Sequence, residues 1–569
     1  MLTLQLDEVR RLTGPSLLWD KSGAIIDVLF EGIEQQSVLS CLQKWVEHLL
    51  SEFDWKQESY THRLHQFGLN FALSAPLDSL YSACDVLELA WDCTVSELQH
   101  SALPDWSARL HVIAAELKQE KNPAMLALMH AAEQHQVSCL LDDDHISLGM
   151  GATTSTWPVR EIPDLESIPW AQYKDIPSAL ITGTNGKSTS VRLAAQMAKA
   201  AGICVGVTST DFIRVGDEII DYGDYSGPGG ARMLLRDTRC ELAVLEVARG
   251  GILRRGLPVK KVNAALITNV ASDHLGQYGI NTVAELAQTK FVVAKALDEC
   301  NVLVLNADDQ LVISQSKHVK ASICWFSCDE FNPLIQQQLQ LGAPAVFIRQ
   351  GEIIYHHQGQ YDAICHVNRV PMTLNGAAVH NVQNALGVVG LAKALHLPQA
   401  AIMQGLQQFG SDSQDNPGRG NVYHINGRQV IVDFAHNEHG MRAVVNMAKQ
   451  LNASRYISMF SHAGDRSNDD MHNLTSAVRE LDAAVYVIAE LDKYLRGRAP
   501  HEVPALSRQF LLEMGVDDQG ILTADSPLQG AQKAVAAAEH GDVVLLFVLE
   551  QRQEIHEWLL SQSEPSVTV

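Results

Sequence analysis

The chain has 569 residues, a hydrophobic content of 46% and a formal net charge of −23 at pH 7. Its length predicts about three domains of roughly 100–200 residues each, and its acidic charge disfavours nucleic acid or an anionic membrane as the main partner. No apolar run approaches the roughly 20 residues of a membrane-spanning helix, the N-terminus lacks the layout of a signal peptide, and the ten cysteines lack zinc or redox spacing, so we expect a cytoplasmic protein.

Residues 1–170 make up the first predicted domain, which has a mixed α+β pattern. Amphipathic stretches at 38–52 and 106–120 have the spacing of helices. The polar, proline-containing segment 153–177 predicts a linker. The sequence leaves the role of this domain open between substrate docking, assembly and a relic.

From 171 to 412, short apolar runs alternate with helical patterns, and this alternation is typical of a parallel sheet covered by helices. The predicted strands lie at 179–181, 242–245, 264–267 and 302–305, and the predicted helices at 191–197, 283–297 and 381–394. A second α/β domain is predicted over 413–569, with strands at 429–434, 457–460 and 543–548.

The stretch 183–189 reads GTNGKST and stands between a predicted strand and a predicted helix. Backbone N–H groups of such a loop, and of the helix start behind it, can cradle phosphates. Lys187 would then reach the terminal phosphates, and the Ser188 hydroxyl would hold Mg²⁺. The strict P-loop pattern fails because residue 181 is Ile, and an ordinary glycine turn is the alternative. The predicted nucleotide-binding residues of the loop are Gly183, Thr184, Asn185, Gly186, Lys187, Ser188 and Thr189.

Polar residues follow the predicted strands, and open α/β sheets bind ligands at the carboxyl ends of their strands. Carboxylates near a phosphate loop suit Mg²⁺, a hard cation that needs oxygen ligands, whereas the imidazole of His274 is a less usual ligand. Each polar group alone could be a strand-end cap, but four in succession behind a phosphate loop favour a site. The four groups begin at Glu246, Thr268, Asn306 and Asp433.

These motifs resemble those of the Mur ligase superfamily, in that family's order and over about 178–560. The matching features are GTNGKST, Glu246, Asn269, Asp273, His274, Lys290, 306–309, His380, Asn381, Asn384, Asp433 and 435–437. Within the superfamily, the chain is most similar to the C-terminal half of the cyanophycin synthetases. The stretches that carry this similarity are 223–228, 246–254, 269–276, 464–466 and 496–498. The resemblance implies a Mur-like central parallel-sheet domain and a Mur-like C-terminal α/β domain.

The N-terminal region is similar to the cyanophycin synthetases at 12–15 (LTGP) and 147–151 (SLGMG). In that family an ATP-grasp domain would follow the second stretch. Here the GTNGKST loop follows within about 30 residues, a gap too short for a domain. The resemblance therefore implies that one of that family's two active sites is missing.

Mur-type ligases use ATP to phosphorylate a carboxylate, and an amine then attacks the acyl phosphate. The resemblance implies ATP and Mg²⁺ as cofactors, with Lys187 neutralising the phosphates. It implies that Ser188, Glu246 and His274 hold the metal. Lys290 aligns with a lysine that many Mur ligases carbamylate, and a surface helix lysine is the alternative. The residues implied as catalytic are Lys187, Glu246, His274 and Lys290. The residues that the resemblance adds to the nucleotide site are Asn381, Asn384, Arg419 and Asp433.

Substrate residues are also implied by the resemblance. The loop with Asp224, Ser226 and Arg232 resembles the one that cyanophycin synthetases present to their chain end. Arg249 and Arg254 could bind a carboxylate in bidentate fashion, or form surface salt bridges instead. The full set implied for substrates is Asp224, Ser226, Arg249, Arg254, His436, Asp465, Arg466 and Arg498.

The sequence thus predicts an ATP-dependent ligase that forms an amide between a carboxylate and the amine of an amino acid. The acceptor could be a small acidic molecule, a peptide end or the product of a separate ATP-grasp enzyme, and assembly into a homo-oligomer stays open. The alternative is a non-catalytic partner of another ligase that binds a nucleotide or a peptide. Retention of Lys187, Ser188, Glu246 and His274 favours the enzyme.

Overall fold

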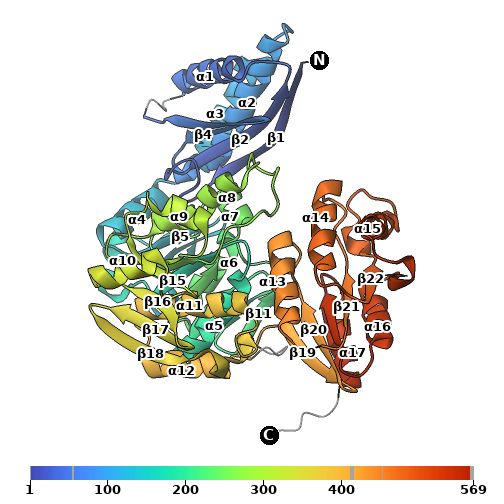
Figure 1. Ribbon diagram of the computed structural model, residues 1–569. Coiled ribbons are helices and arrows are strands. Elements are labelled where there is room, and N and C mark those ends of the chain that lie inside the picture. Colours follow the sequence, from blue (N-terminus) through green and yellow to red (C-terminus); the bar gives the residue numbers. More distant parts are fainter. Residues whose placement is uncertain (1, 54, 56, 411–414, 452, 564–569) are drawn as a thin grey trace. The chain divides into compact units, whose positions relative to one another are not determined.

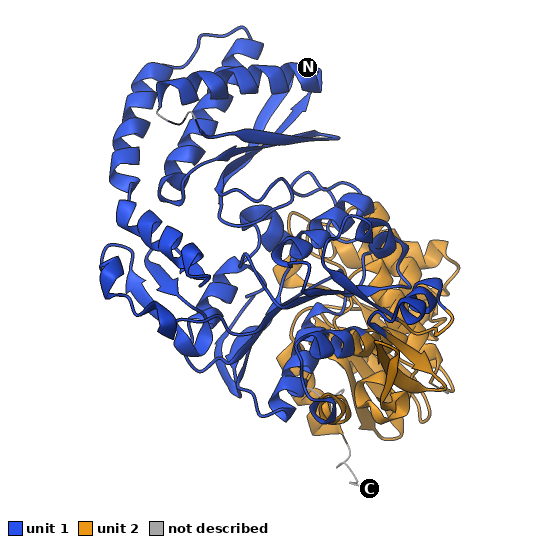
Figure 2. Ribbon diagram, turned by 90° about the vertical axis from the view of Figure 1, so that its left-hand side faces the viewer, with its two compact units in different colours: residues 1–326, 332–345, 387–401 blue, residues 327–331, 346–386, 402–569 orange. Residues whose placement is uncertain are grey.

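The computed structural model describes residues 2–53, 55, 57–410, 415–451 and 453–563. The chain forms two compact units (Figure 2). Unit 1 comprises 1–326, 332–345 and 387–401, and unit 2 comprises 327–331, 346–386 and 402–569. The predicted domain boundary at 412/413 lies outside the described residues, and the boundary at 170/171 stays a prediction.

An antiparallel sheet in the order β1-β2-β4-β3 opens unit 1, with helices packed against one face (Figure 1). Every residue of β4 is buried, and its side chains share a hydrophobic core with helices α1 and α2 that includes Phe71, Leu87 and Trp91. The elements are β1 (Thr3–Leu12), β2 (Gly23–Glu31), α1 (Gln35–Glu52), β3 (Tyr60–His65), β4 (Gly68–Ser74), α2 (Leu80–Leu98) and α3 (Trp106–Glu120).

A smaller sheet in the order β5-β6-β7 follows helix α4 (Pro123–Gln134). Its last strand, β7 (Ser155–Pro158), falls inside the segment 153–177, so the prediction of a linker is wrong there. The strand forms because Trp157 pairs with Ile146 across the ladder and packs on an apolar cluster. The other strands are β5 (Cys139–Leu141) and β6 (His145–Leu148).

The central sheet of unit 1 runs in the order β11-β10-β9-β12-β8-β13-β14-β15. From β9 to β15 neighbouring strands are parallel, while β10 and β11 extend the sheet antiparallel. Strands β8, β12 and β13 are buried along their whole length, as parallel strands covered on both faces are. The predicted parallel sheet is confirmed. The strands are β8 (Ser178–Thr182), β9 (Val205–Thr208), β10 (Phe212–Val215), β11 (Glu218–Tyr222), β12 (Leu242–Glu246), β13 (Ala264–Ile267), β14 (Val302–Asn306) and β15 (Ser322–Ser327).

The helices of this region follow the strands in alternation, and one of them differs from its prediction. The stretch 283–297 is not a single α-helix, because α8 (Val283–Lys290) gives way to a tighter 3-10 turn over Phe291–Ala296. α8 begins with a capping box between Thr282 and Glu285. Two consecutive valines just after it weaken the α-helix. The other helices are α5 (Lys187–Ala200), α6 (Pro228–Leu235), α7 (Arg249–Arg255), α9 (Gln310–Ser316) and α10 (Pro333–Leu341).

Unit 2 contains a sheet in the order β19-β20-β24-β21-β22-β23. Only the pair β19–β20 is antiparallel among the described ladders of this sheet. Alternate side chains of β20 enter different cores: Ile431 packs toward α13 to α15, and Val430 and Val432 pack toward α16 and α17. The predicted second α/β fold is confirmed. The sheet's elements are β19 (Arg419–Ile425), β20 (Arg428–Asp433), α13 (Glu438–Lys449), β21 (Tyr456–Phe460), α14 (Asn468–Arg479), β22 (Val485–Ala489), α15 (Glu502–Glu513), β23 (Ile521–Ala524), α16 (Pro527–Ala537), β24 (Val543–Phe547) and α17 (Arg552–Gln562).

Strands β16, β17 and β18 continue the order of the 11-stranded sheet after β15, with β17 and β18 paired as an antiparallel hairpin, and two helices follow them in the sequence. Helix α11 corresponds to the helix predicted at 381–394. These elements are β16 (Ala345–Arg349), β17 (Glu352–His357), β18 (Gln360–His366), α11 (Val379–Ala394) and α12 (Gln399–Gln408). Among the described residues, no helix combines the length and the apolar character needed to cross a membrane.

Candidate functional site

The phosphate loop joins β8 to α5 and is held in one conformation by its glycines. Gly183 and Gly186 have φ angles of +152° and +85°, which residues with a Cβ rarely adopt. A Cβ on Gly183 would lie 1.9 Å from Thr268 Oγ1. Lys187 folds back on the loop, where its Nζ donates to the carbonyl oxygens of Gly183 (3.1 Å) and Thr184 (3.0 Å). The ammonium group is therefore already placed at the loop.

The segment that follows β13 braces the phosphate loop. The N–H of Thr184 donates to Asn269 O at 2.9 Å, and the N–H of Asn185 donates to Asn269 Oδ1 at 3.0 Å. In return, Thr268 Oγ1 and Asn269 Nδ2 donate to Asn185 O at 2.6 and 3.1 Å. Reciprocal bonds of this kind fix the loop before a ligand arrives. One of the four predicted polar groups, the one that begins at Thr268, is thus in contact with the phosphate loop.

Oxygen atoms gather beside the first turn of α5. Ser188 Oγ lies 3.1 Å from Thr210 Oγ1, and the N–H of Thr210 donates to Glu246 Oε2 at 3.3 Å. Glu246 ends β12 and is only 2% exposed. Sequence reasoning missed Thr210, although its place in the polar run that follows β9 was a usable signal. Two of the predicted metal ligands therefore lie on either side of this threonine.

His274 lies in the same unit, in the loop that continues from 268–271, with a left-handed φ of +49°. Its Nε2 lies 3.9 Å from Asp273 Oδ1. Arg249, the first residue of α7, donates from Nη1 to His274 O at 2.5 Å and from Nη2 to Gln277 Oε1 at 2.6 Å. Burial lowers the pKa of Arg249, an effect that Asp273 opposes. Arg249 thus holds the backbone of the His274 loop.

Lys290 ends α8 and is 3% exposed. Burial holds the pKa of its amine well below the usual 10.5, the positive charge of Lys187 lowers it further, and the carboxylate of Asp273 acts in the opposite direction. Because the charge of Lys187 affects the pKa of Lys290, the two amines lie near enough to interact electrostatically. The surface-lysine alternative is wrong, because this lysine is buried.

The predicted substrate residues of unit 1 do not form one cluster. Asp224 accepts from the N–H and Oγ of Ser226 at 3.0 and 2.6 Å, and the Ser226 carbonyl accepts from the N–H of Ala248 at 3.0 Å. This turn therefore lies next to the segment after Glu246. Arg254 is exposed on α7, whereas Arg232 lines a cavity at another place in the unit.

Asn381 and Asn384 belong to unit 2 and are buried on the first turns of α11. Asn381 Nδ2 donates to Met372 O at 2.9 Å, and Asn384 Nδ2 donates to Asn381 Oδ1 at 3.2 Å. A Cβ on Gly420 would lie 4.0 Å from Asn381 Nδ2. The two asparagines therefore adjoin the start of β19, where Arg419 lies.

Arg419 and Asp433 face each other across the β19–β20 ladder. Burial raises the pKa of Asp433 to about 6, although the N–H of Ala435 and the charge of Arg419 lower it. The guanidinium carbons of Arg419 and Arg552 lie 5.1 and 4.9 Å from the centre of the Phe434 ring. Sequence reasoning missed Arg552, because nothing in its local pattern marks the stacking. Two cations therefore lie close to the Asp433 end of β20.

The remaining predicted substrate residues of unit 2 engage other protein groups. Arg466 Nη2 donates to His436 O at 2.9 Å, and Asp465 pairs with Arg496 at 2.6 Å. The Arg498 guanidinium donates four hydrogen bonds. Nε donates to Gly464 O at 3.3 Å and Nη1 to Glu502 Oε1 at 2.8 Å. Nη2 donates to Asn468 Oδ1 at 2.7 Å and to Arg466 O at 3.3 Å. The Arg498 guanidinium therefore ties the 464–468 loop to helix α15.

Family comparisons agree with this geometry. The profile of the Mur ligase middle domain matches residues 181–392, and the profile described as Mur ligase, glutamate ligase domain, matches residues 418–547. These segments belong to the Mur ligase family. The Mur ligase middle domain thus contains the phosphate loop, Glu246, His274 and Lys290, and the ligase domain contains Asp433. The resemblance seen in the motifs is confirmed.

Curated relatives of the Mur ligase segments include several cyanophycin synthetases. The cyanophycin synthetase of Synechocystis sp. is 35% identical over 338 residues, which are 59% of this chain and 38% of that protein. The cyanophycin synthetase of Crocosphaera subtropica is 36% identical over 332 residues, 58% of this chain and 38% of that protein. The chain therefore matches less than half the length of these relatives.

More distant similarity extends to other ligases. The UDP-N-acetylmuramoyl-L-alanyl-D-glutamate–2,6-diaminopimelate ligase of Geobacter metallireducens is 25% identical over 395 residues, which are 65% of this chain and 73% of that protein. Among solved structures, E. coli FolC in complex with DHPP and ADP aligns with a TM-score of 0.49 and 16% identity, over 68% of this chain and 89% of that chain.

Proposed function

We propose that this chain is an ATP- and Mg²⁺-dependent ligase that activates a carboxylate as an acyl phosphate and joins it to the amine of an amino acid. The observation that carries the proposal is the preformed phosphate loop with Lys187 folded onto it, next to the buried carboxylate of Glu246. Membership of two segments in the Mur ligase family supports the same reaction class.

The donor atoms beside the loop fit Mg²⁺. Hydroxyl oxygens of Ser188 and Thr210 lie 3.1 Å apart, and the Glu246 carboxylate accepts from the N–H of Thr210. Hard oxygen donors of this kind suit Mg²⁺, which keeps several waters and bridges substrate phosphates. We propose Ser188, Glu246 and His274 as the residues that hold it. When bound, the metal supplies charge neutralisation on the transferring phosphoryl group.

The two steps of the reaction place different demands on the chain. A carboxylate oxygen attacks the γ-phosphorus of ATP and the bond to the β-phosphate oxygen breaks, so ADP leaves. The amine nitrogen then attacks the acyl carbon, inorganic phosphate leaves, and the nitrogen loses a proton. Negative charge gathers on the phosphoryl oxygens in the first step, and Lys187 lies where it would offset that charge.

Lys290 is proposed to act as a carbamate. A buried amine with a lowered pKa is neutral more often than an exposed lysine, and only the neutral amine attacks CO₂. The product is an anionic carbamate and a released proton. This reaction replaces a neutral buried amine with an anion, which the positive charge of Lys187 favours.

The residues of unit 2 are proposed to serve the nucleotide and the amino acid. Asn381 and Asn384 would contact the adenine side, and Arg419 and Asp433 the ribose and phosphates. His436, Asp465 and Arg466 would lie near the incoming amino acid. The names of the relatives suggest an acidic peptide or small acid as the acceptor, and we propose that a separate ATP-grasp enzyme could supply it.

The test is phosphate release by the purified chain with ATP and Mg²⁺, against a matrix of acidic acceptors and amino acids that includes aspartyl peptides and arginine. We expect release that requires both an acceptor and an amine, with a product whose mass equals their sum minus water. No phosphate release across the matrix, with ATP binding still measurable, would instead favour a non-catalytic nucleotide-binding partner.

The matched variants are Lys187→Ala and Lys199→Ala, both on helix α5. Lys187→Ala is expected to lower the turnover rate by about 100-fold or more, the cost of removing one preorganised charge-stabilising donor. Lys199 is exposed and paired with Asp217 at 2.6 Å, so Lys199→Ala should leave the rate within about twofold. Equal rates in both variants would contradict the role of Lys187.

A further inference from the structure

Unit 1 contains a large cavity at the end of the central sheet where β8, β13 and β14 begin. The phosphate loop follows the opposite end of β8. The cavity has a volume of about 1300 Å³. Its lining includes Ser178, which starts β8, together with Asn263 and Asn301, which directly precede β13 and β14. The phosphate loop follows the other end of β8, five residues away, so about 16 Å of strand separates the two places. The cavity is thus distinct from the candidate nucleotide site.

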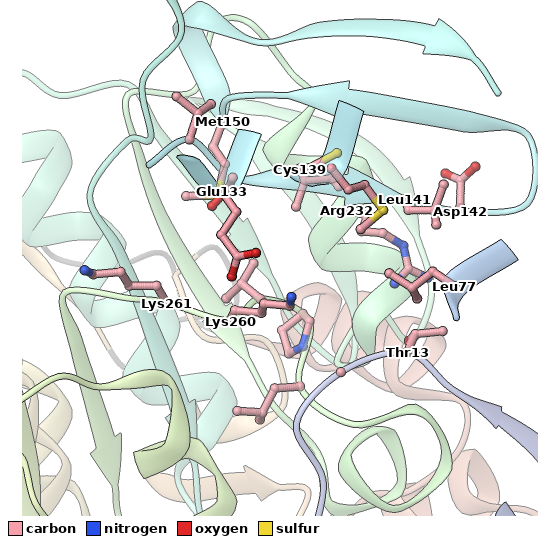
Figure 3. Close-up of a pocket in the computed structure, with 18 of the residues that line it drawn as sticks. Thr13, Leu77, Glu133, Cys139, Leu141, Asp142, Met150, Arg232, Lys260 and Lys261 are labelled. Atoms are coloured by element: carbon pink, nitrogen blue, oxygen red, sulfur yellow. The ribbon is translucent and has the colours of Figure 1, made fainter. Parts of the chain in front are cut away.

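The cavity lining includes three arginines, Arg11, Arg232 and Arg255, and the adjacent aspartates Asp142 and Asp143. Asp143 binds Arg11, and Asp142 binds Arg236. The three arginines come from β1, α6 and α7, and Figure 3 shows Arg232 beside Asp142, Leu77 and Thr13. Both carboxylates are therefore paired, and within the part of the chain that the structure describes no carboxylate forms an ion pair with Arg232 or Arg255. In a protein with a net charge of −23, local positive charge of this kind favours the binding of an anion.

Arg232 is the least satisfied of these groups. Its side chain is half-buried, and among the described residues it makes no hydrogen bond or ion pair. Within the described ranges, the only acceptor of the Arg255 side chain is Arg11 O, at 3.2 Å from Nη1. Burial lowers the pKa of Arg232, the carboxylates of Asp142 and Asp143 oppose this effect, and the charges of Arg236 and Arg255 lower the pKa further. An anion placed between Arg232 and Arg255 would relieve this repulsion.

Other carboxylates along the cavity are already engaged. Glu120 accepts from the N–H groups of Tyr81 and Ser82 at 2.8 and 3.0 Å, and Asp175 accepts from the hydroxyl of Ser138 at 2.7 Å. They act as caps and turn anchors. Lys260 and Glu133 lie at the end of the cavity away from Arg232 (Figure 3).

Apolar side chains also line the cavity, among them Met125, Met129, Leu140 and Met150. Flexible methionine side chains adapt to ligands of varied shape. A cavity with an apolar floor and a few convergent charged groups is the usual form of a small-molecule site. The ligand should therefore combine one charged group with an organic body.

We propose that this cavity binds an organic oxyanion, either a carboxylate or a phosphate ester, with its charged group on Arg232 and Arg255 and its apolar body along Met125, Met129 and Leu140. The planar fork of Arg232 matches both kinds of oxyanion in bidentate fashion. Because the site does not involve the phosphate loop, it is independent of the proposed ligase activity.

The test is calorimetric titration of the full chain, without ATP or Mg²⁺, with 3-phenylpropionate and with phenyl phosphate. The neutral probe 3-phenylpropanol serves as the reference. We expect at least one anion to bind and the alcohol not to bind, and the tighter of the two anions identifies the carboxylate or the phosphate ester as the natural class. Failure of both anions to bind, or equal binding of the alcohol, would overturn the proposal.

Variants separate the site from the rest of the molecule. Arg232→Gln should weaken anion binding about tenfold to a hundredfold, the usual worth of charge-assisted hydrogen bonds, and Arg232→Lys should fall between it and the unchanged chain. Arg239→Gln removes an exposed arginine that pairs with Asp237 and Glu218, and should change nothing.

Two further readouts keep the outcome clear. Because Arg232 makes no bonds to the protein, Arg232→Gln should unfold at the same temperature as the unchanged chain, and it should still bind ADP. Lys187→Ala should show the reverse pattern, with anion binding retained and ADP binding weakened. Anion binding that is retained in Arg232→Gln but lost in Lys187→Ala would assign the anion to the phosphate loop. That result would contradict the proposed cavity site.

Discussion

Lys290 carries an amine inside the protein at a position where the sequence pattern only requires a helix. Because its folded-state pKa lies well below 10.5, the unfolded chain holds a proton that the folded chain lacks at pH values between the two. Folding stability therefore rises with pH across that interval, by up to about 1.4 kcal/mol per pH unit.

Lys290→Met is expected to remove this slope and to raise the free energy of unfolding at pH 7. The check is urea unfolding of both proteins at pH 7, 8 and 9 in buffers freed of CO₂, which prevents carbamate from forming. The gap between the two proteins should narrow toward pH 9. Parallel pH profiles would mean that Lys290 is protonated in the folded chain.

Asp433 presents the opposite case of a carboxyl group whose burial raises its pKa from 3.8 to about 6. Between these pH values the folded chain holds a proton that the unfolded chain has lost, so stability falls as the pH rises. The difference corresponds to about 3 kcal/mol once both states are ionised. A cost of this kind is common at binding sites.

Asp433→Asn should therefore stabilise the chain at pH 7 and leave its stability nearly unchanged at pH 4, because the amide oxygen can still accept from the N–H of Ala435. Denaturant unfolding at the two pH values measures the effect. The same variant should bind ATP more weakly under the proposed function. Equal stabilisation at both pH values would show that packing, rather than ionisation, sets the cost.

At the scale of elements, the N-terminal sheet holds the loop that continues from His274. Arg63 on β3 donates from Nη1 and Nη2 to Gly279 O at 3.0 and 2.6 Å. Gly279 has a φ of +70°, and a Cβ there would lie 2.5 Å from His65 Cδ2. The guanidinium of Arg10 lies 5.2 Å from the Tyr278 ring centre. The sheet thus positions a loop that Arg249 holds from the other side.

Arg63→Ala is expected to lower the turnover rate about tenfold and to raise the Mg²⁺ concentration needed for half-maximal rate, while the KM for ATP stays within about twofold. The reason is that two charge-assisted bonds to the loop, each worth about 1.5 kcal/mol or more, are lost. Steady-state rates against Mg²⁺ and ATP measure both quantities.

The control for Arg63→Ala is Arg109→Ala, in the same N-terminal region. Of the residues that the structure describes, Arg109 pairs only with the exposed Asp92, at 2.5 Å, so its removal should leave both quantities unchanged. A uniform loss of rate in both variants, with no change in the Mg²⁺ requirement, would indicate general destabilisation rather than positioning.

At the scale of the whole molecule, elements with strong periodicity could be predicted from the sequence. The buried runs that became β8, β12 and β13 were found because both faces of a parallel strand are covered and leave continuous apolar residues. Predictions failed where long-range contacts decide. Strand β7 exists because Trp157 finds Ile146 in a neighbouring strand, and no local pattern in 153–177 signals that pairing.

The sequence by itself determined the α/β fold class, the phosphate loop and the family, because these depend on local periodicity and on short motifs with fixed spacing. Only the tertiary structure decided that Lys290 is buried and that Arg249 holds the His274 loop. It also decided that the Arg498 side chain donates to a neighbouring loop and helix, and that Arg232 lines a cavity apart from the phosphate loop. Burial, charge balance and the satisfaction of donors depend on partners far apart in the chain, and folding alone brings them together.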